Sequence, residues 1–185
     1  MKRLAGGMLA LACLCAADDF DQVMRLLAAR RHGHVEFIEQ QFLAVLKRPI
    51  ESSGELFYDA PDRLEKRTSQ PRAEDLVLAG GELTVERHGR RRVLDLQRFP
   101  QIRPFIESIR ATLAGDRSAL ERVFHVEFTG DVHRWSLTLV PLDRQLLRTL
   151  SEVRIDGSLD QLHRVEIRQP DGDRSLLTLR PAAAP

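Results

Sequence analysis

Histidines are the first side chains in this sequence to consider for metal chemistry. Six are present, and His32 and His34 are near enough to each other to supply two metal ligands from one short segment. A zinc site needs three or four ligands at defined spacings, and no third ligand of suitable spacing accompanies this pair. His125 and His133 could approach each other across a hairpin, where paired surface positions explain them better than a metal. The histidines therefore give no case for a metal centre.

The motifs of common catalytic and nucleotide-binding sites are absent from the sequence. It contains no G-x-S-x-G elbow, no H-E-x-x-H motif and no phosphate-binding loop. Asp171-Gly172-Asp173 is too short for a calcium loop and stands where a hairpin turn is expected. The other carboxylates have no spacing that selects a pair for acid–base work. We therefore predict a protein that is not an enzyme and that uses no cofactor.

Charge and composition narrow the class of partner. The 185 residues include 28 Lys and Arg and 27 Asp and Glu, and the formal net charge is +1. This balance gives no global attraction for nucleic acid. The basic run Arg90-Arg91-Arg92 is short and typical of an edge strand, where charge discourages unwanted pairing. Hydrophobic residues make up 43% of the chain, as in ordinary globular domains. We therefore expect no nucleic-acid partner.

Residues 1–17 have the three-part pattern of an export signal. Lys2 and Arg3 form a basic start, an apolar run follows from Leu4 to Leu14, and small residues precede a cleavage point after Ala17. The apolar run is too short to span a bilayer. The alternative is a buried N-terminal helix. The pattern favours a signal peptide and a protein located outside the cytoplasm.

Both cysteines, Cys13 and Cys15, lie inside this segment. Lipid attachment needs a small residue directly before the cysteine and usually a leucine three positions before it, and Cys13 fits this pattern in part while Cys15 fits it poorly. Cleavage after Ala17 would remove both and leave a chain without thiol chemistry. We expect residues 18–185 to form a single domain.

Three helices are predicted to position the rest of the chain. Asp18–Arg31 and Gln101–Ala114 carry apolar residues at helical spacing. Gly115 is a suitable end for the second of them. Asp116 can cap a third short helix over Arg117–Val123.

The remaining sequence reads as ten or eleven short strands. A long first strand is expected over His34–Leu46, and later segments alternate apolar and polar residues. Nearly every connection has the length of a hairpin, so the sheet should be antiparallel, and we predict a mainly β protein with helices whose sheet is strongly curved or forms an incomplete barrel. The predicted turns are Ala60-Pro61-Asp62, Gly80-Gly81, His88-Gly89, Gly130-Asp131, Asp156-Gly157 and Asp171-Gly172.

The helix around Phe105 and Ile109 has two interpretations. It could pack on the core, as most amphipathic helices in globular domains do. It could also cover an apolar cavity as a lid, with Pro104 and Gly115 at its ends as hinges. The residue pattern alone favours core packing, because a lid and a core helix share the same apolar spacing.

Three segments, in this order, resemble the LolA family of periplasmic lipoprotein carriers. The sequence GELFY at Gly54–Tyr58, followed by Pro61, is similar to the family's G-x-L segment before a turn proline. The segment LVLAGGEL at Leu76–Leu83 is similar to the hairpin that follows. Pro104-Phe105-Ile106 resembles the start of the family's lid helix. The chain thus resembles a divergent, LolA-related branch.

The resemblance implies a half-barrel of antiparallel strands covered by a helical lid, with an apolar interior that holds acyl chains. It implies a periplasmic carrier that moves a lipoprotein or glycolipid from an inner-membrane exporter complex to an outer-membrane acceptor, and we expect a monomer. The alternative is an interaction or assembly module of the periplasm built on the same half-barrel, without transport.

The resemblance also implies site residues. The family's functional arginine directly precedes the turn proline, and Ala60 occupies that position here; Arg63 follows the proline. Thr84 stands where the family's hairpin has an aromatic residue. The predicted lid and gating residues are Pro61, Arg63, Pro104 and Ile106. The predicted lining of the lipid cavity consists of Leu56, Tyr58, Leu64, Phe105, Ile109, Leu113, Trp135, Leu137 and Leu139.

Overall fold

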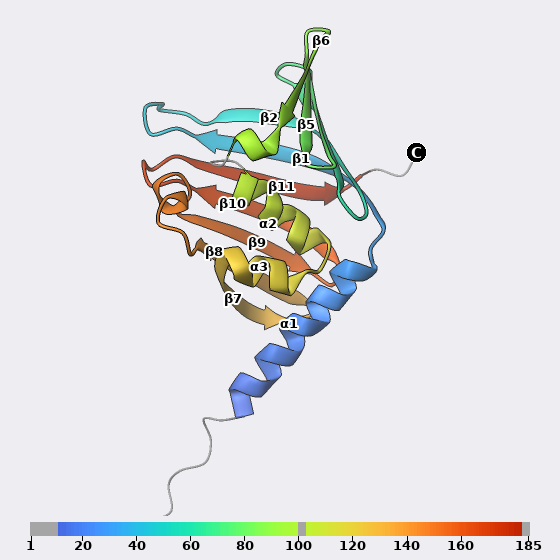
Figure 1. Cartoon of the computed structure of the whole chain (residues 1–185), viewed down its shortest axis with the longest axis vertical. Helices are drawn as coiled ribbons and strands as arrows, with labels where there is room; N and C mark the ends of the chain where they lie inside the picture. Colours follow the sequence, from blue (N-terminus) through green and yellow to red (C-terminus); the bar gives the residue numbers. More distant parts are fainter. Residues whose placement is uncertain (1–10, 100–102, 183–185) are drawn as a thin grey trace, which may run out of the picture.

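Eleven strands form one antiparallel sheet in the computed structural model (Figure 1). The structure describes residues 11–99 and 103–182, except for the side chains of residues 11–17 and 105. The spatial order is β6-β5-β4-β3-β2-β1-β11-β10-β9-β8-β7. The strands are β1 His32–Phe42, β2 Ile50–Asp59, β3 Arg63–Gln70, β4 Glu74–Ala79, β5 Glu82–Arg87, β6 Arg90–Asp95, β7 Phe124–Asp131, β8 Arg134–Pro141, β9 Glu152–Ser158, β10 Gln161–Arg168 and β11 Arg174–Pro181.

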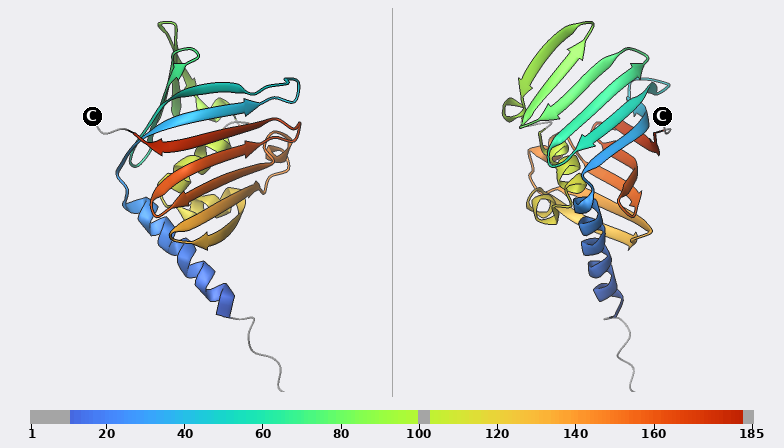
Figure 2. Two further views of the ribbon diagram at one scale, coloured as in Figure 1. Left: turned by 180° about the vertical axis from the view of Figure 1, so that it is seen from behind. Right: turned by 90° about the vertical axis from the view of Figure 1, so that its right-hand side faces the viewer.

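Three α-helices lie on one face of this sheet, and the sheet curves around them (Figure 2). Helix α1 contacts β7 and α2, while α3 contacts α2 and β7. Within the described ranges, no helix is both long enough and apolar enough to cross a bilayer. The helices are α1 Leu11–Ala29, α2 Arg103–Leu113 and α3 Arg117–Val123, and two short 3-10 turns cover Leu96–Arg98 and Leu146–Arg148.

The sequence prediction of an open, antiparallel, mainly β fold is confirmed. Gly80 and Gly81 both have positive φ and join β4 to β5, as the hairpin signal predicted. Asp116 caps α3 through a hydrogen bond that its carboxylate accepts from the Ala119 N–H, at 2.9 Å. Every strand pairing except that of β1 with β11 joins strands that follow each other in sequence, so consecutive strands build each half of the sheet and the β1–β11 pairing joins the two halves.

Two predicted turns were wrong. Gly130 and Asp131 are the last residues of β7, and the turn follows them. Gly157 lies within β9, directly opposite Trp135 on β8, and a Cβ atom there would stand 2.3 Å from the indole ring. Glycine at 157 therefore makes room for the packed tryptophan. In sequence, a glycine with this role cannot be distinguished from a glycine in a turn.

Other boundaries also moved. Strand β1 ends at Phe42, four residues before the predicted end, because the Ala44 N–H leaves the ladder and donates to Asp173 Oδ1 at 2.7 Å. Helix α1 begins at Leu11, inside the predicted signal segment, and residues 1–10 of that segment lie outside the described residues. The signal peptide and the domain limits 1–17 and 18–185 remain predictions.

His125 pairs with Val140 and His133 lies in the β7–β8 turn, so these two histidines do not face each other.

The main core fills one half of the curved face. Helices α1 and α3 cover strands β7 to β10 there, and their apolar side chains pack against the sheet. The most deeply buried of these residues are Val23, Leu27, Leu120, Phe124, Trp135, Leu137, Leu139, Val153 and Ile155. The other half of the same face, under α2, is filled differently.

Candidate functional site

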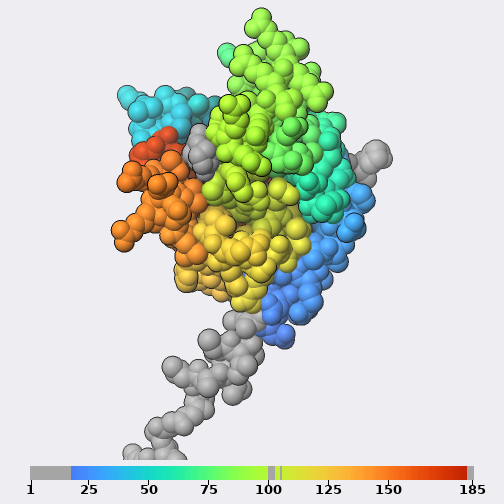
Figure 3. All heavy atoms as spheres, viewed as in Figure 1, coloured from blue at the N-terminus to red at the C-terminus, as the bar shows by residue number. Residues whose placement is uncertain are grey.

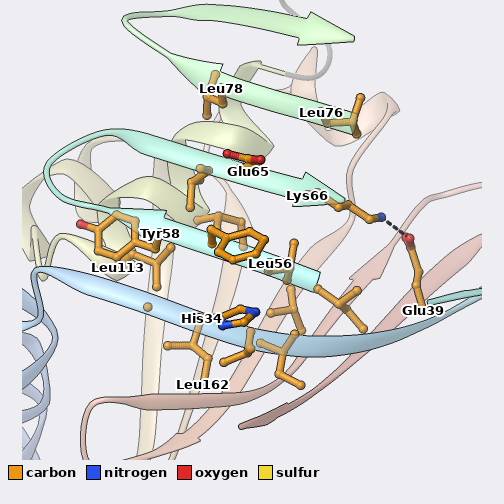
Figure 4. A pocket seen from close by; sticks show the side chains of 18 of the residues that line it. His34, Glu39, Leu56, Tyr58, Glu65, Lys66, Leu76, Leu78, Leu113 and Leu162 are labelled. Atoms are coloured by element: carbon orange, nitrogen blue, oxygen red, sulfur yellow. Dashed lines mark hydrogen bonds and ion pairs between the residues drawn. The ribbon is translucent and has the colours of Figure 1, made fainter. Parts of the chain in front are cut away.

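A cavity of about 590 Å³ lies between α2 and the second half of the curved face. Its floor comes from β1 to β5 and from β10 and β11. Residues that pair across neighbouring strands share one face of the sheet, so Val35 and Leu56, then Tyr58 and Leu64, then Leu78 and Leu83 follow one another across it. Most of the floor is therefore apolar, and Figure 4 shows side chains from part of the lining.

Helix α2 forms the roof of this cavity. Ile106, Ile109 and Leu113 recur at spacings of three and four residues, so one face of the helix is turned to the floor. The helix ends in a Schellman motif, in which the Gly115 N–H donates to the Thr112 carbonyl and the Asp116 N–H to the Ala111 carbonyl. Pro104 lies in its first turn, where a missing N–H leaves no bond unmade.

Most of the sequence-predicted lining residues meet at this cavity. Leu56, Tyr58, Leu64, Ile109 and Leu113 line it, and Ile106, predicted for the lid, lines it too. The side chain of Phe105 lies outside the described part of the structure. The sequence did not single out other lining residues, among them Val35, Leu76, Leu83, Leu177 and Leu179.

Trp135, Leu137 and Leu139 are not lining residues. They lie on the same face of the sheet, because β8 keeps the alternation of the floor, but they belong to the core under α1 and α3. Trp135 is almost fully buried, and its indole N–H donates to the Leu159 carbonyl at 3.1 Å. Strand periodicity predicts which face a residue shares, and the helices then decide which part of that face is hollow.

One charged pair interrupts the apolar floor. Lys66 forms a close ion pair with Glu39, and Figure 4 marks it with a dashed line. The Glu39 carboxylate also accepts hydrogen bonds from Ser175 at 2.7 Å and from Gln41 at 3.3 Å. The Lys66 ammonium lies 4.8 Å from the centre of the Phe37 ring. Glu39 lies near the end of β1 and Ser175 near the start of β11, so this polar group marks one end of the cavity.

The environment of Glu39 keeps it ionised. Burial raises the pKa of its carboxyl, but the charge of Lys66 and the hydrogen bonds from Lys66, Ser175 and Gln41 together outweigh burial, so the pKa lies below the ordinary value of 4.5. A lowered pKa stabilises the folded state above the unfolded value. That contribution is lost as the pH falls through the folded pKa.

Replacing Lys66 by methionine is expected to lower the free energy of unfolding at pH 7 by about 2–3 kcal/mol, because Glu39 is then buried without a cation. The loss should shrink below about pH 4, where the carboxyl can take up a proton. Urea denaturation at several pH values measures both effects.

The matched control is the double variant Glu39→Gln/Lys66→Met. It removes both charges together, so it should cost less stability at pH 7 than the single Lys66→Met change. An equal or larger loss of stability in the double variant would contradict the view that Lys66 stabilises the fold by neutralising the buried Glu39 carboxylate.

Arg30 closes the opposite end of the cavity. Its guanidinium donates to the Asp160 carbonyl at 2.9 Å and to the His32 carbonyl at 3.2 Å. The bond to Asp160 joins the end of α1 to the β9–β10 turn. Because Arg30 also borders the cavity, α1 both anchors the sheet and limits the length of the hollow.

The predicted gating residues lie at the β2–β3 turn. Pro61 follows a cis peptide bond with Ala60. Arg63 is absent from the cavity lining found in the described residues, and its neighbour Leu64 is the one that faces the cavity. The Arg63 guanidinium instead pairs with Glu65 at 2.8 Å and lies 3.9 Å from Asp59. No contact ties Arg63 to α2 in the described part of the chain.

The paired histidines of β1 have carboxylate partners. His32 Nδ1 lies 2.8 Å from Asp59, and His34 Nε2 lies 2.9 Å from Glu55. His34 also stacks on Phe57, with 4.3 Å between ring centres. Across the described residues, no group of three or more His, Cys, Asp or Glu side chains is arranged to hold a metal ion.

One comparison with known proteins covers nearly the whole sequence. The family model described as outer membrane lipoprotein carrier protein LolA-like matches residues 12–185. No curated protein has significant sequence similarity to the chain.

Solved structures with a similar fold are distant in sequence. A LolA superfamily protein from Nitrosomonas europaea is 12% identical, with a TM-score of 0.44 over 92% of this chain and 95% of that one. A putative outer membrane lipoprotein-sorting protein domain from Vibrio parahaemolyticus is 13% identical, with a TM-score of 0.44 over 92% and 94%. A chain of the Pseudomonas aeruginosa MucA/MucB complex is 13% identical, with a TM-score of 0.48 over 92% of this chain and 58% of that one.

Proposed function

Because the chain belongs to the LolA-like family of outer membrane lipoprotein carrier proteins, we propose that it carries a lipid or lipoprotein by enclosing acyl chain in the cavity beneath α2. The observation that carries this proposal is the contrast between the two halves of the curved face. Side chains of α1 and α3 fill one half, whereas the other half is apolar and hollow. An apolar hollow of this size is the usual form of a small-molecule site.

The size of the cavity sets the amount of cargo that it can enclose. A methylene group is about as large as a water molecule, whose share of liquid volume is about 30 Å³. The volume of 590 Å³ therefore holds about 20 methylene groups. That corresponds to one long acyl chain in the conformation described here, so a diacyl or triacyl anchor would need α2 to move outward.

The energy of burial is sufficient for a carrier. Each methylene removed from water contributes about 0.8 kcal/mol. A chain of about 16 carbons therefore gains roughly 12 kcal/mol before the costs of association are subtracted. A protein that gains this free energy on binding protects an acyl chain from water. An acceptor that binds the acyl chain more tightly can still take it over without ATP.

The family and the signal-like pattern of residues 1–17 support the periplasm as the compartment of this transfer. We propose that residues 1–17 direct the chain to the periplasm, where an inner-membrane exporter complex loads it and an outer-membrane acceptor unloads it. The carrier acts as a monomer in this proposal, and it needs no cofactor or catalytic group.

Extraction of the protein purified from its native host, followed by mass spectrometry, tests the proposal. We expect a copurifying lipid or acylated peptide, and competition between that lipid and a fluorescent acyl probe. Clean protein that takes up no probe would contradict the carrier function and would favour the interaction or assembly module. Turnover of the bound lipid would instead indicate an enzyme.

A further inference from the structure

Large apolar side chains are exposed at the ends of two loops. The β1–β2 loop exposes 88% of Val45 together with about half of Leu46, and Ile50 at the start of β2 is also exposed. The β8–β9 loop exposes 57% of Leu142 and more than a third of Leu147. Single exposed apolar residues are ordinary, but a group of them on one side of a molecule marks an interaction site.

The two loops lie on one edge of the molecule. Strands β2, β1, β11, β10, β9 and β8 are consecutive neighbours and antiparallel, so the β1–β2 loop, the β10–β11 turn and the β8–β9 loop emerge at the same side. The bond from the Ala44 N–H to Asp173 joins the first two of them. Figure 3 shows the cyan, red and orange segments together at the left edge. We call this edge the rim, defined as residues 43–50, 142–151 and 169–173.

The apolar tips of the rim are flanked by exposed cations. Among the described residues, none of these cations takes part in an ion pair or in a side-chain hydrogen bond. The acids of the rim are Asp143, Asp171 and Asp173, and each accepts a backbone N–H of its own turn or of the neighbouring loop. The unpaired cations are Lys47, Arg48, Arg144 and Arg148.

We propose that the rim docks on the surface of an anionic lipid bilayer. The apolar tips would enter the boundary between head groups and acyl chains, and the adjacent Lys and Arg side chains would contact lipid phosphates. Cations beside an anionic leaflet each strengthen binding, and they do so without requiring a fixed partner geometry. Projecting apolar tips on two separate loops suit a flat, fluid surface better than they suit a protein groove.

The rim also stands next to the polar end of the cavity. Gln41 and Ser175 line the cavity and pair with each other across β1 and β11, and the next pair, Phe42 and Arg174, opens into the rim. A docked rim would therefore hold this end of the cavity against the bilayer. The inference rests on the exposed surface and is independent of the cargo in the proposed function.

Vesicle flotation tests the inference with two rim variants and two matched controls. The purified protein is mixed with vesicles of phosphatidylcholine alone, or of phosphatidylcholine with about one third phosphatidylglycerol. Val45→Glu/Leu46→Glu removes the apolar tip, and Lys47→Gln/Arg48→Gln removes two cations. The controls make the same kinds of change on β6. Val93→Glu, at a residue that is 53% exposed, matches the apolar change, and Arg91→Gln/Arg92→Gln matches the loss of two cations.

We expect the protein to bind the anionic vesicles more tightly than the neutral ones, with the preference falling at high salt. Each rim variant should lower the affinity about tenfold or more, and each β6 control should change it less than threefold. Uptake of an acyl probe from solution should be unchanged in all four variants, so a failure of the carrier function would appear there and not in flotation.

Three results would overturn the inference. The first is the absence of binding to anionic vesicles. The second is binding that the rim variants leave unchanged, which would place the contact on another surface. The third is a rim that fails to bind vesicles but captures an isolated exporter or acceptor protein, which would make the rim a protein-docking surface.

Discussion

Leu177→Glu abolishes uptake of a fluorescent acyl probe in our expectation, whereas Leu176→Glu leaves it nearly intact. Leu177 lines the cavity on β11, and Leu176 is the next residue of the same strand, directed to the opposite face. A carboxylate at residue 177 would lose its hydrating water when the acyl chain of the probe enters the cavity, and this dehydration costs several kcal/mol. We expect the probe affinity to fall at least 100-fold.

The pair is a matched comparison because both residues are leucines of intermediate burial on one central strand. Thermal unfolding of both variants provides the control for folding, and fluorescence titration provides the affinity. Equal loss of uptake in two folded variants would show that the probe does not occupy the cavity under α2. Ile109→Glu tests the same cavity from the roof and should also prevent loading.

The second large effect is expected for Gly115→Ala, which should lower the free energy of unfolding by about 3–5 kcal/mol. Gly115 has a φ of +62°, and a Cβ atom there would stand 2.1 Å from the Met24 carbonyl oxygen of α1 and 2.8 Å from the Ala28 Cβ. The backbone of α1 cannot yield without separating from α2. The cost therefore adds an overpacked contact to the strain of a left-handed alanine.

Gly80→Ala isolates the contact from the backbone strain. Gly80 has a similar φ of +59°, but nothing stands within 4 Å of an added Cβ. This control should lose only about 1–2 kcal/mol. If chemical denaturation gave equal losses for the two variants, the close packing between α1 and the end of α2 would be disproved.

The sequence predicted the fold better than it predicted which part of the fold is hollow. Local signals, such as Gly80-Gly81 between two alternating segments and Asp116 before a short helix, depend on a few neighbouring residues, and the structure confirms them. Gly157 was misread because a glycine that accommodates Trp135 looks the same in sequence as a glycine in a turn. Packing between distant segments decides between the two.

The site shows the same limit. Leu56, Leu64 and Leu113 were placed at the cavity, while Trp135 and its neighbours on β8 lie in the core, because α1 and α3 cover that half of the sheet. The pair of Glu39 and Lys66 joins residues 27 positions apart. A signal was present in the alternation Val35, Phe37, Glu39, where a charge takes an inward position, but its partner could come only from the register of β1 to β3.

The tight junction at Gly115 has a directional consequence for the roof helix. Helix α2 has 11 residues and is about 16 Å long, and it runs from the side of the rim toward α1, where the junction holds it (Figure 1). A rod held at one end moves most at the other. A rotation of about 20° about the junction displaces the first turn by about 5 Å and the last turn hardly at all. Such a rotation would widen the hollow toward the rim, so cargo exchange and contact with a bilayer would take place on the same side of the molecule.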